Sequence, residues 1–177
     1  MYTLEEKVVY PGHGVAKVED IVQKTIGSTT VQFYKLKFLN RDMTILIPVQ
    51  TQETCGIRPL SSEQGIQKMF EVLSEPSTKR GCVLSSWNKR SKQYQYKIKT
   101  GDLLEISRIY RDLQCMSHEK DLSFGERNLL HQAEALLVEE LSAVRNMMEE
   151  QAVQTLRVIF IEMLPRMMHL SGVQTHL

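Results

Sequence analysis

Hydrophobic and polar side chains alternate with a period of two in much of the first third of the chain. This part is rich in Val, Ile, Thr, Phe and Tyr, which favour extended backbone. Turn residues separate the runs. The pattern predicts strands over residues 7–10, 14–25, 30–39 and 43–48. Such short strands are best protected from edge pairing if the sheet curls into a small barrel.

The hydrophobic period changes after Arg58 and Pro59. Apolar side chains then recur at steps of three and four residues, which indicates amphipathic helices. Ser61 and Gln64 resemble a capping box for a first helix, which Pro76 ends. We expect a second helix through the stretch before Gly101, and a third helix that begins at Asp102.

Ser123 and Glu126 form a further capping box, which predicts the start of a fourth helix. Its apolar stripe comprises Leu130, Ala133, Leu137, Leu141 and Val144. Residues 151–168 are also predicted to be helical, with Pro165 expected to kink or end the helix. The fold class is therefore α+β, with a small β-barrel over residues 1–60, a compact helical domain over residues 61–150, and a helical extension with a loosely held tail over residues 151–177.

Charge adds a feature that the hydrophobic pattern does not reveal. The whole chain has 22 Lys and Arg against 21 Asp and Glu, so it is nearly neutral. Between Pro76 and Gly101, however, it has seven basic residues and no acidic one, and its only tryptophan, Trp87, lies among them. A concentrated positive charge favours a polyanionic partner, and an indole can stack on a base or enter a groove. The combination indicates nucleic-acid binding.

Each of these residues also has a purely structural interpretation. A single tryptophan commonly packs between helices. The polar neighbours of Trp87, which include Ser86, Asn88 and Lys89, nevertheless favour its exposure. Tyr94 and Tyr96 could either stack on nucleic acid or support a helical core.

Other function classes have little support in the sequence. His, Cys, Asp and Glu show none of the spacings of zinc sites, and the motifs of P-loop nucleotide binding and of serine hydrolases are absent. Gly12-His13-Gly14 is interpreted as a turn, and Glu139-Glu140 as part of a solvated helix face. We expect no enzyme, cofactor or metal. The cysteines are expected to be reduced, and the sequence shows no secretory signal or membrane span. These features favour a cytoplasmic protein.

Several short motifs follow one another along the chain from Lys7 to about Arg145. The motifs are Val8-Val9-Tyr10-Pro11-Gly12-His13-Gly14-Val15-Ala16, Ile47-Pro48-Val49, Gly56-Ile57-Arg58, Trp87-Asn88-Lys89-Arg90, Gly101-Asp102, Arg111-Asp112-Leu113 and Leu122-Ser123-x-Gly125-Glu126. Their order resembles that of the CarD/CdnL family of bacterial transcription regulators.

The resemblance implies a Tudor-like barrel that binds the RNA polymerase β subunit and a helical domain that contacts promoter DNA. It assigns Trp87 as a wedge at the upstream edge of the melted DNA. Lys89, Arg90 and Lys92 match its phosphate-facing neighbours. Lys24 and Leu46 match two polymerase-facing positions where family members often have arginine, so the polymerase contact is expected to be weaker or differently shaped.

The sequence therefore leads to a non-enzymatic, monomeric regulator that stabilises the open promoter complex with little sequence specificity. An alternative is a KOW-like or Tudor-like adaptor that binds RNA or a protein peptide through its barrel. In that case the helices would serve only as a scaffold.

Overall fold

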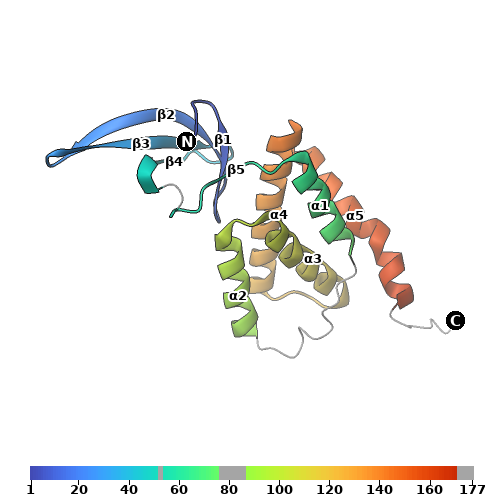
Figure 1. Cartoon of the computed structure of the whole chain (residues 1–177). Coiled ribbons are helices and arrows are strands. Elements are labelled where there is room, and N and C mark those ends of the chain that lie inside the picture. Colours follow the sequence, from blue (N-terminus) through green and yellow to red (C-terminus); the bar gives the residue numbers. More distant parts are fainter. Residues whose placement is uncertain (52–53, 76–86, 171–177) are drawn as a thin grey trace.

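A computed structural model describes residues 1–51, 54–75 and 87–170, with side chains described through Ile161. A β-sheet domain lies beside a helical domain (Figure 1). The strands are β1 (Lys7–Tyr10), β2 (Gly14–Ile26), β3 (Thr29–Phe38), β4 (Thr44–Pro48) and β5 (Arg58–Pro59), with a short 3-10 turn η1 (Val49–Thr51). The α+β class and the amino-terminal β-domain are confirmed.

The five strands form one antiparallel sheet in the order β4-β3-β2-β1-β5. Alternating side chains on its inner face form a core of Val8, Ala16, Val18, Tyr34, Leu36, Phe38, Ile47 and Ile57. An irregularity between Val18 and Asp20 shifts the register of β2 against β3. Such a bulge increases the local twist, which helps a small sheet curve around its core.

Among the residues that the structure describes, five helices follow the sheet. They are α1 (Glu63–Ser74), α2 (Trp87–Thr100), α3 (Leu103–Glu119), α4 (Phe124–Arg145) and α5 (Glu149–Leu170). The predicted starts of α3 and α4 are confirmed, because Asp102 caps α3 and Ser123 with Glu126 forms the capping box of α4. The N-cap of α1 lies one residue later than the sequence predicts. Ser62 caps this helix, while Ser61 hydrogen bonds to Glu140 on α4.

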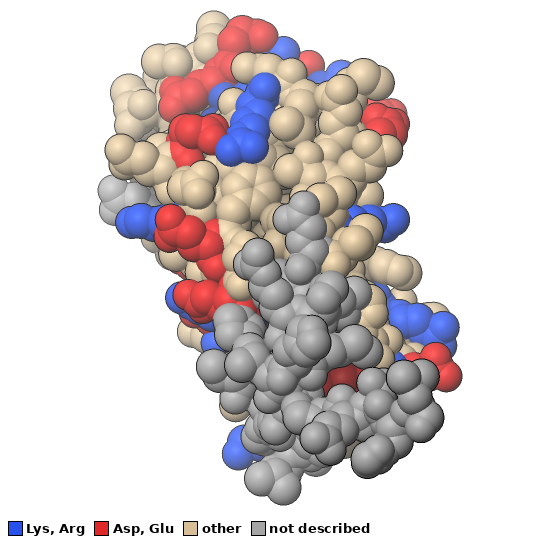
Figure 2. Space-filling model, turned by 90° about the vertical axis from the view of Figure 1, so that its right-hand side faces the viewer, with Lys and Arg blue, Asp and Glu red and all other residues tan. Residues whose placement is uncertain are grey.

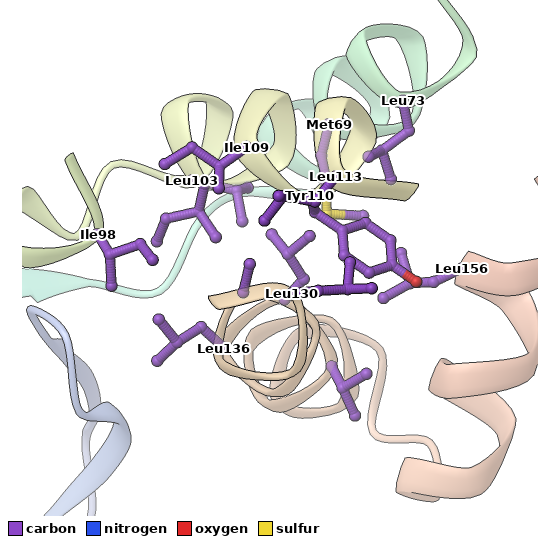
Figure 3. Close-up of a cluster of buried hydrophobic side chains, with 14 of the residues drawn as sticks. Met69, Leu73, Ile98, Leu103, Ile109, Tyr110, Leu113, Leu130, Leu136 and Leu156 are labelled. Atoms are coloured by element: carbon purple, nitrogen blue, oxygen red, sulfur yellow. The ribbon is translucent and has the colours of Figure 1, made fainter. Parts of the chain in front are cut away.

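Apolar side chains from all five helices meet in one core (Figure 3). Leu130, Ala133, Leu137 and Leu141 of the predicted α4 stripe are buried in it. Pro165 was expected to kink or end the last helix, and it does not end it, because α5 continues to Leu170. Proline removes one backbone donor, which weakens a helix without preventing its continuation. None of the described helices is both long and apolar enough to span a membrane.

Candidate functional site

Helix α2 has an inner and an outer face with different chemistry. The inner face buries Arg90, Tyr94 and Ile98, which are four residues apart. The outer face exposes Lys89, Lys92, Tyr96 and Lys99, which follow one another at steps of three or four residues. We call Lys89, Lys92 and Lys99 the lysine stripe. No acidic residue occurs between Trp87 and Thr100, so the stripe is a surface of one charge sign.

The structure distinguishes the two tyrosines that the sequence left open. Tyr94 is buried on the inner face and belongs to the helical core, whereas Tyr96 is 72% exposed beside the lysine stripe. Lys97 lies between the two faces and pairs with Glu105 of α3 at 2.5 Å. Lys79 and Arg80, which contribute to the basic stretch of the sequence, lie outside the described residues.

Trp87 is the first residue of α2 and is partly buried. Its indole packs against the edge of the helical core and against Gly125 in the first turn of α4. The polar neighbours of Trp87 in the sequence predict a more exposed ring. The contact with α4 explains the difference, because residues far away in the sequence cover one side of the indole.

The expectation that Arg90 faces phosphate does not agree with its position. Its side chain is 9% exposed, and its guanidinium pairs with the Glu126 carboxylate of α4 at 3.4 Å. Glu126 also accepts hydrogen bonds from Lys120 and from the backbone N–H of Ser123. Burial raises the pKa of Glu126, but these hydrogen bonds outweigh that effect and hold the pKa below its usual value. Arg90 thus attaches α2 to α4, while Lys89 and Lys92 face solvent.

Lys24 and Leu46 lie on the same outer face of the sheet. Lys24 pairs with Val31 across β2 and β3, and Leu46 pairs with Lys35 across β3 and β4. Val31 and Lys35 are four residues apart on β3, and paired residues project to the same side, so all four side chains share a face. Lys24 is exposed and Leu46 is 39% exposed. Both sequence-predicted residues are therefore accessible on one surface.

The face between Lys24 and Leu46 has an apolar centre. Val22, Phe33 and Pro48 are paired across β2, β3 and β4 and occupy the row between the two predicted residues. Each is partly buried, and none of the three belongs to the sheet core formed by the described residues. A half-exposed apolar row with a cation at its edge is suited to a protein partner.

Two adjacent glutamates of α4 connect the helical domain to the sheet. Arg58 of β5 binds the Glu140 carboxylate through both terminal nitrogens, at 2.6 and 2.7 Å. The same guanidinium donates to the carbonyl of Gly101, which lies between α2 and α3, at 2.8 and 2.9 Å. The Ser61 backbone N–H and hydroxyl also donate to Glu140. A bidentate pair of this kind restricts orientation as well as distance.

The neighbouring carboxylate, Glu139, accepts a hydrogen bond from the backbone N–H of Val15 in β2, at 3.0 Å. Gly14 has a φ of 99°, and a Cβ there would overlap the Glu139 carboxylate. Burial raises the pKa of Glu139, and the hydrogen bond from Val15 offsets only part of that effect. We call Arg58, Ser61, Gly14 and the two glutamates the domain junction.

The sequence interpretation of Glu139 and Glu140 as a solvated face is wrong, because they are 8% and 3% exposed. The spacing gives a clue. Glu139 and Glu140 follow the buried Leu136 by three and four residues, and residues at that spacing lie on the same face of a helix. Gly12 and His13 do lie in the turn between β1 and β2, as predicted, and Gly14 is the first residue of β2. That turn packs on the end of α2, with Gly12 close to the Lys99 backbone.

Figure 2 shows the side of the molecule that lies at the right in Figure 1, where acidic and basic side chains are interspersed with uncharged ones. Within the described part of the chain, no group of three or more His, Cys, Asp or Glu side chains could hold a metal ion.

Comparisons with known proteins match both domains. Residues 2–61 match the family model of the CarD-like/TRCF RID domain, and residues 68–157 match that of the CarD C-terminal domain. The chain is also 29% identical over 151 residues to "Putative transcription factor YdeB" of Bacillus subtilis (strain 168). The aligned region covers 85% of this chain and 97% of that protein. With both models matched in order, the chain belongs to the CarD/CdnL family.

Proposed function

We propose that this protein is a transcription regulator that binds the RNA polymerase β subunit through its sheet and promoter DNA through α2. It stabilises the open complex from the upstream edge of the melted region and acts as a monomer. The observation that carries the proposal is the combination, on one helix, of the lysine stripe and a partly exposed Trp87 at its first turn. Membership of the CarD/CdnL family and the name of its relative support it.

On the DNA side, Lys89 and Lys92 neutralise phosphates and orient α2. Trp87 enters the distorted minor groove beside them. Contacts of lysine with phosphate do not read bases, so the protein acts at promoters of different sequence. The indole fits only DNA that is unstacked, and it therefore shifts the equilibrium toward the open form by its preference for that form. Arg90 has an indirect role, because its pair with Glu126 holds α2 in place.

On the polymerase side, the outer face of β2, β3 and β4 contacts the β subunit. Lys24 supplies a charge, and the apolar row with Leu46 supplies buried area. Lysine lacks the two-pronged geometry of arginine, and leucine supplies no charge. The contact therefore relies more on apolar burial than on ion pairs, and we expect its affinity to depend only weakly on salt.

The DNA contact is tested by open-complex lifetime with purified polymerase. Trp87→Ala should shorten the lifetime while polymerase binding is retained. Lys89→Glu and Lys92→Glu, each made as a single substitution, should weaken binding to promoter DNA and reduce the salt slope by about one, for the one lost phosphate contact. Lys68→Glu, which alters an exposed lysine on α1, is the charge-matched control for a single reversal.

The adaptor alternative makes a different prediction for the same experiment. If the helices are only a scaffold, reversal of the lysine stripe leaves duplex binding and its salt slope unchanged. An unchanged lifetime with Trp87→Ala would likewise exclude the wedge.

The polymerase contact is tested with Lys24→Glu and a fragment of the β subunit. We expect a clear loss of binding in a pull-down or by calorimetry. Gln23→Glu is the control, because Gln23 is the adjacent exposed residue and projects from the other face of β2. Equal binding by the two variants would show that the partner does not use the outer face.

A further inference from the structure

The indole of Trp87 rests on a glycine. Gly125 is the second residue of α4, and a Cβ placed there would lie 2.8 Å from Cζ2 of the indole and 3.4 Å from both Cε2 and Nε1. A separation below 3 Å is not tolerated between carbon atoms, and an aromatic ring cannot bend out of the way. Only glycine therefore allows the ring its present position against the helix.

The first turn of α4 that carries Gly125 is itself firmly held. Ser123 and Glu126 cap the helix reciprocally, with the Glu126 carboxylate 2.8 Å from the Ser123 backbone nitrogen. The same carboxylate binds Lys120 at 3.1 Å and Arg90 of α2 at 3.4 Å. The surface under the indole and the helix that carries the indole are thus tied to each other within one turn of Trp87.

We infer that Gly125 is a positioning residue for Trp87, and that Glu126 keeps the two helix ends in register for it. The glycine forms a shallow seat that supports the Nε1 side of the indole and leaves the ring only partly buried. This preorganisation limits the orientations that the ring must lose when it enters DNA. The inference rests on the proposed function, because it concerns how the wedge is presented.

The seat can be tested without DNA, since Trp87 is the only tryptophan and reports its own surroundings by fluorescence. Gly125→Ala should displace the ring into solvent, with an emission maximum at longer wavelength and faster quenching by acrylamide. Gly65→Ala is the matched control. Gly65 also lies in the first turn of a helix, but a Cβ there would meet Ser61 rather than the indole. Unchanged emission and quenching with Gly125→Ala would overturn the inference.

Thermal unfolding separates loss of the seat from a general effect on α4. Gly125→Ala should lower Tm by about 2–4 °C relative to Gly65→Ala, which combines the benefit of alanine in a helix with a close contact to Ser61 and none to a ring. In a Trp87→Ala background the same substitution should cause no such loss, because the ring that it would strike is gone. An equal loss in both backgrounds would assign the effect to the backbone of α4 and contradict a seat for the indole.

Open-complex lifetime then tests the role of the seat. We expect Gly125→Ala to shorten the lifetime by about fivefold or more, the lower end of typical couplings between sites. If Trp87→Ala shortens the lifetime and Gly125→Ala does not, the wedge stands and the positioning role is wrong. If neither variant shortens it, the wedge is wrong and the positioning role falls with it, whatever the fluorescence shows.

Discussion

At the scale of single residues, Glu139 and Glu140 are adjacent carboxylates whose burial is compensated to different degrees. Glu140 receives two hydrogen bonds from Arg58 and two from Ser61. Glu139 receives the amide of Val15, and the net effect of its surroundings is a raised pKa. A buried carboxylate without an adequate cation is stabilised by protonation. The junction therefore contains one group whose contribution depends on pH.

Glu139→Gln tests this dependence. The folded state binds the Glu139 proton more tightly than the unfolded state, so Glu139 contributes less stability as pH rises from its ordinary value of 4.5 through the raised pKa. Glutamine keeps a carbonyl oxygen that can accept from Val15 and has no proton to lose. The variant should therefore gain stability relative to the parent as pH rises from 4.5 through the raised pKa of Glu139, as measured by urea unfolding.

Glu105→Gln is the control of opposite sign. A hydrogen bond from Lys97 is the main cause that lowers the pKa of Glu105, so its contribution is present above pH 4.5 and is lost as pH falls through the lowered pKa. This variant should be less stable than the parent near neutral pH, with a difference that shrinks on acidification. A pH-independent difference for Glu139→Gln would contradict the raised pKa.

Arg90 and Lys89 are neighbouring cations of α2 that should contribute differently to stability, and single substitutions can measure this difference. Arg90→Ala leaves the buried Glu126 without one of its partners and should lower the free energy of unfolding by about 2–3 kcal/mol. Lys89→Ala removes an exposed side chain and should change it by less than about 0.5 kcal/mol. Urea unfolding of both variants checks the assignment. Similar stabilities would mean that Arg90 is not a structural cation.

At the scale of elements, α5 shows how tertiary packing supports a helix whose sequence contains a proline. Ala152, Leu156 and Phe160 recur every four residues and are buried against the other helices. The Phe160 ring meets Tyr110 of α3 edge to face, with centroids 5.5 Å apart. Helices in proteins derive most of their stability from such a buried face. Packing along the preceding turns of α5 therefore compensates for the helix stability that Pro165 removes.

Substitutions on the two faces of α5 test its docking. Phe160→Ala should lower the free energy of unfolding by about 3–4 kcal/mol, because it removes a buried ring and leaves a cavity. Ile161→Ala, one residue further along, alters a side chain that is 66% exposed and should cost less than about 0.5 kcal/mol. Chemical denaturation gives both values. If the two costs are equal, α5 does not dock through the face that contains Phe160.

At the scale of the whole molecule, the domain junction sets how the outer face of the sheet and α2 are placed relative to each other. Arg58, Ser61 and Glu140 tie β5 and the chain after it to the middle of α4. Glu139 ties the start of β2 to the same turn. The proposed bridging of polymerase and promoter DNA requires such a fixed separation, because a loose link would lower the effective concentration of the second contact.

Breaking this junction should affect both stability and shape. Arg58→Met leaves the buried Glu140 without its cation and should cost about 3–5 kcal/mol. The double substitution Arg58→Met with Glu140→Met should cost less than the single one, since no buried charge remains. Small-angle X-ray scattering should give a larger radius of gyration for Arg58→Met.

Glu63→Gln is the control for this prediction, since it breaks the exposed pair with Arg145 between α1 and α4 and should cost less than about 1 kcal/mol. A scattering profile of Arg58→Met identical to that of the parent would show that other contacts determine the domain arrangement.

Local sequence patterns determined the elements of this protein and most of their boundaries. Alternation predicted β1 to β4, and the signals at Asp102, Ser123 and Glu126 predicted where α3 and α4 begin. These signals act between residues only a few positions apart. The two-residue strand β5 was not predicted, because its pairing with β1 has no periodicity to detect.

Tertiary structure alone decided which charged residues became internal. Lys89 and Arg90 are adjacent in the sequence and are both cations. Their residue types do not show which of the two side chains is buried against a partner. The buried partners are far apart in the sequence. Arg90 and Glu126 are separated by 36 positions, Arg58 and Glu140 by 82, and Val15 and Glu139 by 124. A buried charge is tolerated only where such a partner exists, and only the packed chain brings that partner within reach.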